Sequence, residues 1–278
     1  MPITDPWQFY TMMGYPKAHP EQYFYYKQKV DTTVPITQKT RPTYSNAMKQ
    51  RIQKIEKYAR LRRQLPFIKA IYLCDSMSFN AANDGSDIDL FFITKHRAIR
   101  RARWCSVCIF RLLGMKRTLQ KKSWLFDCIF YVDENHTDLE KIFCQPEDIY
   151  LTYRLAHLIP LYTQEQAGYN IYTHNTRIKK ILPNFPMQQS ISLPIQIRKW
   201  SWYIKRVGEL ALGYWLDNFW EYIIKTIWKP IVVRKTKKHG ETGRWIIVTD
   251  TMLKFHNDKR KIIQSRRENL KHTTGEKK

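Results

Sequence analysis

The segment Gly85–Thr94, GSDIDLFFIT, constrains the fold of this chain more than any other stretch. A Gly-Ser turn is followed by two aspartates two positions apart, Asp87 and Asp89, and then by an apolar run. This pattern predicts a β-strand that opens just after a turn. Side chains at i and i+2 of a strand share a face, so both carboxylates should project together from the start of a buried strand. Two such carboxylates repel, and a cation with a preference for hard oxygen ligands, above all Mg²⁺, would relieve the repulsion.

The residues upstream extend the pattern. Residues 67–74, FIKAIYLC, indicate an earlier strand that ends at Asp75-Ser76, and ten residues separate Ser76 from Asp87. In this layout residues 67–94 resemble the nucleotidyltransferase superfamily that includes DNA polymerase beta. The resemblance is to the small bacterial and archaeal type with a helical C-terminal extension. It continues more weakly through residues 130–134 and 155–162, and so covers about half of the chain.

The resemblance implies an α+β fold, with a small mixed-sheet core flanked by helices and a mostly α-helical C-terminal region. It also implies two metal ligands at Asp87 and Asp89 and a third on a neighbouring strand. Asp127 is the candidate, because it interrupts an otherwise apolar strand at 124–132, where an unpaired charge would be costly. The alternatives for Asp127 are pairing with a Lys or Arg, or an outward position on an edge strand.

Phosphate binding is predicted for Ser76, Lys95 and Arg97. The Ser76 hydroxyl and backbone N–H can bond a phosphate oxygen. Lys95 and Arg97 follow the Asp-x-Asp strand closely, and guanidinium groups form bidentate contacts with phosphates. A solvated cationic face is the alternative for these basic residues.

The chain departs from the family pattern at Asp75, where the family has glycine. A glycine allows close approach of a triphosphate to the backbone. Asp75 would repel the nucleotide unless its side chain turns away or binds a metal. On the repulsion argument, Asp75→Gly should strengthen nucleotide binding.

Composition limits the partners. The formal net charge of +24, from 48 basic and 24 acidic side chains, favours a polyanionic partner such as nucleic acid, with an anionic membrane surface or general basicity as alternatives. Five cysteines without a regular framework are most simply reduced thiols, which predicts a cytoplasmic protein. The N-terminus does not resemble a signal peptide, and polar residues interrupt the most apolar stretch, 210–228, so we expect no transmembrane segment.

The sequence predicts four regions: an extended arm (1–46), the nucleotidyltransferase-like core (47–162), a helical C-terminal region (163–270) and a disordered tail (271–278). Within the core we expect helices over 47–65, 96–114 and from 146 to just before Pro160. Beyond the core we expect one or two long helices in 194–228, a short strand at 245–248 and a last helix from Thr251 to about Leu270.

The predicted function is a Mg²⁺-dependent transfer of a nucleoside monophosphate from a nucleoside triphosphate, with ATP the expected donor and two metal ions allowed. The acceptor remains open between a protein hydroxyl, an RNA 3′ end and a small molecule. The alternative is a catalytically impaired relative that binds nucleic acid, and a third candidate is a peripheral membrane protein with basic, Trp-rich helices. The sequence does not fix the oligomeric state.

Overall fold

A computed structural model describes twelve parts of the chain. These are residues 46–58, 64–79, 81–118, 123–143, 148–164, 171, 173–181, 199–213, 222–223, 226, 230 and 247–255. The predicted N-terminal arm, apart from residue 46, and the predicted tail lie outside these residues.

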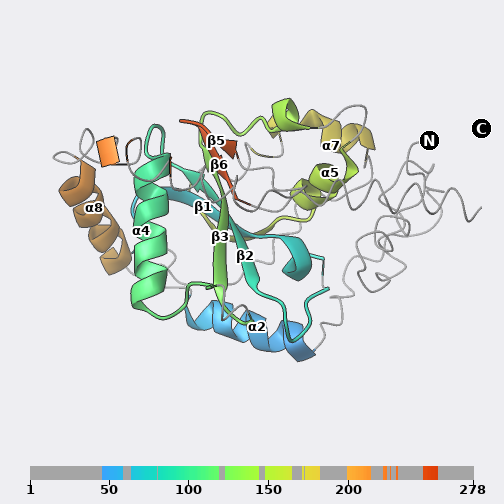
Figure 1. Ribbon diagram of the computed structural model, residues 1–278, viewed down its shortest axis with the longest axis horizontal. Coiled ribbons are helices and arrows are strands. Elements are labelled where there is room, and N and C mark those ends of the chain that lie inside the picture. The colour runs from blue at the N-terminus through green and yellow to red at the C-terminus, as the bar shows by residue number, and fades with distance from the viewer. Residues whose placement is uncertain are drawn as a thin grey trace, which may run out of the picture.

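A mixed six-stranded sheet forms the centre of the molecule, in the order β4-β1-β2-β3-β6-β5 (Figure 1). β2 and β3 run parallel, and all other neighbours are antiparallel. The strands are β1 (Ile68–Leu73), β2 (Ile88–Thr94), β3 (Phe126–Asp133), β4 (Ile159–Thr163), β5 (Ile247–Val248) and β6 (Met252–Lys254). The structure confirms the predicted α+β class with a mixed sheet.

Helices cover both faces of this sheet (Figure 1). One face packs against α2 (Asn46–Lys57) and α4 (Ile99–Leu112), through side chains such as Ile55 and Phe110. The other face packs against α5 (Ile149–Ala156) and α7 (Thr176–Ile181). Apolar residues occupy both parities of β2, as expected for a strand that is buried on both faces.

Helix α8 (Lys199–Gly213) is anchored to the start of β1, on the side of the sheet that carries α4 (Figure 1). The Lys205 ammonium donates to the carbonyl of Ile68, and the Glu209 carboxylate accepts the backbone N–H of Phe67 at 3.0 Å. α8 confirms part of the helical structure predicted for 194–228.

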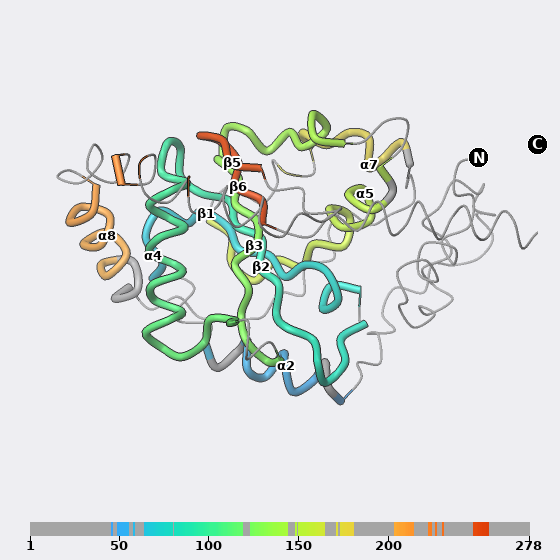
Figure 2. The backbone as a smooth tube through the Cα atoms, in the orientation of Figure 1, coloured from blue at the N-terminus to red at the C-terminus, as the bar shows by residue number. Residues whose placement is uncertain are grey.

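The prediction of a helix that begins at Thr251 is wrong for Met252–Lys254, because these residues form β6. β6 pairs with β3, and Figure 2 shows this late segment beside β3. Two strands from the predicted helical region therefore complete the sheet of the predicted core. β5 confirms the short strand expected at 245–248.

A second difference concerns the residues after α5. The helix ends at Ala156, and Pro160 lies inside β4 rather than beyond a helix end. β4 is an edge strand, where the missing N–H of proline is tolerated.

In the described part of the chain, no helix combines the length and the apolar character that a membrane crossing requires.

Candidate metal centre

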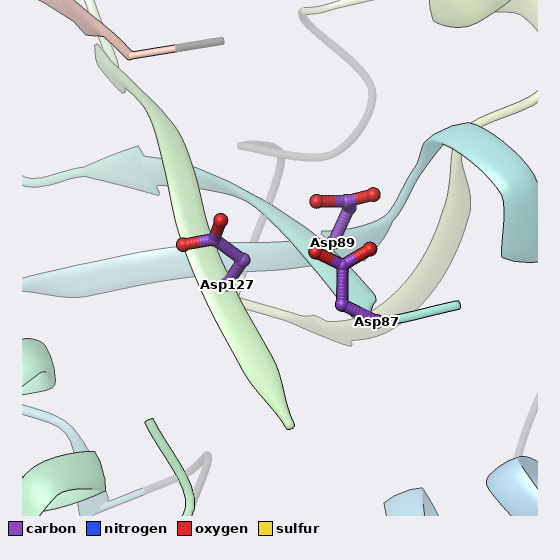
Figure 3. A group of neighbouring side chains, drawn as sticks. All are labelled: Asp87, Asp89 and Asp127. Atoms are coloured by element: carbon purple, nitrogen blue, oxygen red, sulfur yellow. The ribbon is translucent and has the colours of Figure 1, made fainter. Parts of the chain in front are cut away.

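Three carboxylates meet at the N-terminal ends of the parallel strands β2 and β3 (Figure 3). Asp89 lies directly opposite Asp127 in the strand register, and Asp87 precedes β2 by one residue. One oxygen from each carboxylate lies within 4.8 Å of the other two. The convergence of Asp87, Asp89 and Asp127 on adjacent strands, predicted from the sequence, is confirmed.

Helix α2 fixes the turn that leads into this site. The buried Arg51 guanidinium donates to three turn carbonyls, including those of Asn83 (2.5 Å) and Ser86 (3.0 Å). Inside the turn, the backbone N–H of Gly85 donates to the Asn83 side chain at 3.0 Å. Arg51 of α2 therefore holds the backbone of the turn that precedes Asp87.

Two cations that the sequence analysis did not select reach the carboxylates. Lys116 Nζ lies 2.6 Å from Asp127 Oδ1, and Arg117 Nη1 lies 2.8 Å from Asp127 Oδ2. The same guanidinium nitrogen is 2.6 Å from Asp87 Oδ2. Burial would raise the pKa of Asp127, but Lys116 and Arg117 outweigh it and hold this pKa below its usual range.

Asp89 is in a different electrostatic position. Its side chain is buried, and it makes no ion pair within the described residues. Burial raises the pKa of Asp89 well above its usual range, and neighbouring carboxylates raise it further. These carboxylates belong to Asp75, Asp87 and Asp127.

Asp75, where the sequence resemblance leads us to expect a glycine, pairs with helix α5. Its Oδ2 lies 2.8 Å from Arg154 Nη2, and its Oδ1 accepts the Tyr150 hydroxyl at 3.1 Å, both from α5. The Asp75 side chain is 2% exposed and the Arg154 side chain 1%. The charge of the Asp75 carboxylate is therefore balanced by Arg154, although this carboxylate still raises the pKa of Asp89, and the effect of Asp75→Gly on nucleotide binding stays a prediction.

The backbone at Asp75 has a φ of +54°, in the left-handed region that favours glycine. Aspartate is among the residues that tolerate this region best. The turn thus has a backbone shape that suits glycine, but it carries an aspartate whose side chain pairs with α5.

Of the three predicted phosphate-binding residues, Ser76 stays near the carboxylates. It lies in the short helix η2 (Asp75–Met77), and the preceding Cys74 donates its N–H to the carbonyl of Asp89 at 3.1 Å. Lys95 and Arg97 follow the opposite end of β2. A strand of seven residues separates the two ends by about 20 Å, so the structure does not bring these two residues to the site.

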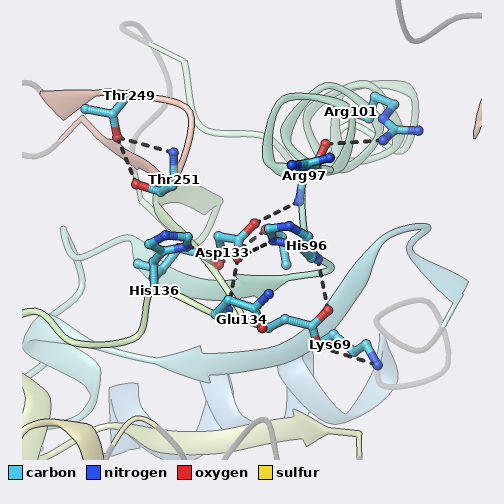
Figure 4. A network of polar contacts seen from close by, with 12 residues as sticks. Lys69, His96, Arg97, Arg101, Asp133, Glu134, His136, Thr249 and Thr251 are labelled. Carbon is cyan, nitrogen blue, oxygen red and sulfur yellow. Dashed lines mark hydrogen bonds and ion pairs between the residues drawn. The ribbon is translucent and has the colours of Figure 1, made fainter.

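Arg97 instead belongs to a second network at the C-terminal ends of β2 and β3 (Figure 4). The Arg97 backbone N–H donates to Asp133 Oδ2 at 2.8 Å, and the Nδ1 atoms of His96 and His136 lie 3.2 and 3.3 Å from Asp133 Oδ1. Burial would raise the pKa of Asp133, but these hydrogen bonds and that of the Asn135 N–H lower it. The network ties two loops to the ends of the sheet.

The residue types at the triad fit Mg²⁺. The ligands are hard carboxylate oxygens on adjacent strands, and Asp89 supplies a buried negative charge that a divalent ion would neutralise. Lys116 and Arg117 were missed because they stand in a run of basic residues that resembles a solvated surface. The one available signal was their place in the connection that leads to the strand that carries Asp127.

Comparison with protein-family models, with curated proteins and with solved structures finds no match to this chain.

Proposed function

We propose that this protein is a Mg²⁺-dependent nucleotidyltransferase that moves a nucleoside monophosphate from a nucleoside triphosphate, ATP as the first candidate, to an acceptor hydroxyl. The observation that carries the proposal is the triad of Asp87, Asp89 and Asp127, with ligand oxygens within 4.8 Å on two parallel strands. The sequence resemblance over residues 67–94 supports the same class.

Each residue has a role in this scheme. Asp87, Asp89 and Asp127 would hold Mg²⁺, which neutralises charge on the attacking and leaving oxygens of an in-line displacement at the α-phosphate. Ser76 would donate its hydroxyl and backbone N–H to a phosphate oxygen. The acceptor hydroxyl would lose its proton to solvent and its oxygen would form a bond to the α-phosphorus. The bond from this phosphorus to the oxygen of the β-phosphate would break, and pyrophosphate would leave.

Asp75 no longer argues against catalysis in this proposal, because its charge is paired with Arg154. The buried, reduced thiols of Cys74, Cys105 and Cys128 support a further proposal, that the protein works in the cytoplasm.

The test is transfer of label from nucleotides labelled at the α-phosphate, with Mg²⁺ and a cell extract as the source of acceptor. Asp89→Asn should reduce transfer at least about a hundredfold, because loss of a metal ligand removes several kcal/mol of transition-state stabilisation. Asp138→Asn, at a partly exposed aspartate outside the triad, is the matched control and should keep full activity.

Thermal unfolding of the same variants separates chemistry from folding. Asp89→Asn replaces a buried carboxylate with a neutral side chain of similar shape, so its unfolding temperature should not fall. Equal transfer by wild type and Asp89→Asn would contradict the proposal.

A further inference from the structure

Arg117 bridges two of the three carboxylates that would hold a metal ion. Its Nη1 atom lies 2.6 Å from Asp87 Oδ2 and 2.8 Å from Asp127 Oδ2. These are distances of charge-assisted hydrogen bonds, and both use oxygens that the proposed metal site needs.

Arg117 and a bridging Mg²⁺ exclude each other. Mg²⁺ binds carboxylate oxygens at about 2.1 Å, so an ion on the same two oxygens would overlap the guanidinium nitrogen. The two positive charges would also repel at this short distance. Arg117 must therefore leave the carboxylates when metal enters.

The structure distinguishes Arg117 from Arg154, another arginine near the site. The Arg117 side chain is 32% exposed and stands on the connection that leads from α4 into β3. Arg154 is 1% exposed and is held by Asp75. Arg117 can move by rotation of its own side chain, whereas Arg154 cannot move without disruption of the core.

We propose that Arg117 is an exchangeable counter-ion, which holds Asp87 and Asp127 together before metal binds and then moves onto the phosphates of the incoming Mg²⁺–nucleotide. This inference rests on the proposed function, since it assumes that the triad binds Mg²⁺ with a nucleoside triphosphate. A guanidinium displaced from two carboxylates is well suited to phosphate oxygens, which it binds with the same fork geometry.

The charge balance supports the exchange. When ionised, the three carboxylates exceed the charges of Lys116 and Arg117 by one, so the site without metal is nearly neutral. Metal ions make the site strongly positive, and the polyanionic triphosphate then restores the balance. Free Mg²⁺ has to displace Arg117 with no new partner for it, whereas the Mg²⁺–nucleotide provides that partner.

Arg117→Gln therefore affects two binding constants in opposite directions. Removal of the competing cation should strengthen binding of Mg²⁺ alone by about tenfold, and removal of a phosphate contact should weaken binding of Mg²⁺–ATP by about tenfold. Arg111→Gln is the matched control. Arg111 is an exposed arginine in the last turn of α4, so this substitution removes the same charge at a position outside the triad.

The experiment is isothermal titration calorimetry of the full chain with MgCl₂ alone, and then with ATP at saturating Mg²⁺. The result expected is tighter Mg²⁺ and weaker Mg²⁺–ATP for Arg117→Gln, with Arg111→Gln equal to wild type. If Arg117→Gln weakens both or changes neither, while Asp89→Asn abolishes Mg²⁺–ATP binding, the exchange is overturned and the proposed function stands. If wild type and all variants fail to bind Mg²⁺ and Mg²⁺–ATP, both are overturned.

Discussion

At the scale of single residues, the pair formed by Asp75 and Arg154 joins the turn after β1 to α5. The two side chains are almost completely buried and 2.8 Å apart, and Tyr150 adds a hydrogen bond to the same carboxylate. Loss of one partner of such a pair leaves an uncompensated buried charge. Asp75 therefore contributes to the stability of the fold.

We expect Asp75→Asn to lower the free energy of unfolding by about 3–5 kcal/mol, because Arg154 would stay buried without its counter-charge. Tyr150→Phe, which removes only the hydroxyl bond to Asp75, should cost about 1.5–3 kcal/mol. Urea unfolding of both variants measures the difference. Wild-type stability in Asp75→Asn would show that the pair does not hold α5 to the turn.

At the scale of elements, the packing of α8 on the start of β1 depends on one glycine. A Cβ atom at Gly208 would lie 2.9 Å from Pro66 Cγ, a closer contact than packed carbon atoms allow. At Gly213, on the same helix, the nearest atom would be Arg101 Nη1 at 3.7 Å.

Gly208→Ala should therefore destabilise the protein by about 1–3 kcal/mol, the usual cost of overpacking. Gly213→Ala should be neutral or stabilise by up to about 1 kcal/mol through helix propensity. Chemical denaturation of the two variants tests this, and equal stabilities would mean that α8 does not rest on Pro66.

The C-terminal end of α5 carries a pH-dependent element. His157 caps this helix and packs against Phe79, with ring centroids 4.7 Å apart, and burial lowers the pKa of His157 from 6.5 to about 4. The unfolded chain takes up a proton near pH 6.5 and the folded chain does not. The contribution of His157 is thus complete above pH 6.5 and is lost as pH falls towards 4.

This difference corresponds to about 3 kcal/mol of folding stability between pH 6.5 and 4. His157→Phe keeps an aromatic ring but cannot take up a proton, so its unfolding free energy should fall less over this range than that of wild type. The check is urea unfolding at a series of pH values. If the unfolding free energies of the two proteins changed equally with pH, the result would contradict a buried neutral His157.

At the scale of the whole molecule, the sequence predicted those features of the structure that the spacing of nearby residues determines. The alternation in β2 places Asp87 and Asp89 on one face, and the lone acid in an apolar strand identifies Asp127. The sequence did not reveal the contacts between distant segments. The partner of Asp75 is 79 positions away in another helix, and Arg117 had the appearance of a solvated charge.

The strands that were missed show the same limit. β6 has only three residues, and it is a strand because β3 offers it an edge, a tertiary effect that overrides local propensity. Pro160 ends helices in most sequences, but at the edge of this sheet it lies in β4.

The net charge of +24 leads to a prediction for the molecule as a whole. A fluorescein-labelled single-stranded RNA should bind, and the binding should weaken at least about tenfold between 50 and 200 mM salt as counterions are released. Fluorescence anisotropy measures this. An uncharged peptide nucleic acid of the same sequence is the control and should not bind, and RNA binding that is insensitive to salt would contradict a partner held through its phosphates.

The pairing of β6 with β3 also sets the order of events during synthesis. The ribosome completes β3 at Asp133, but the strand that covers its outer edge is made only after residue 251. At usual translation rates this interval lasts about ten seconds. Throughout it the nascent chain carries an open, apolar edge at residues 130–132 of β3, the kind of surface that chaperones bind and that pairs wrongly with other chains.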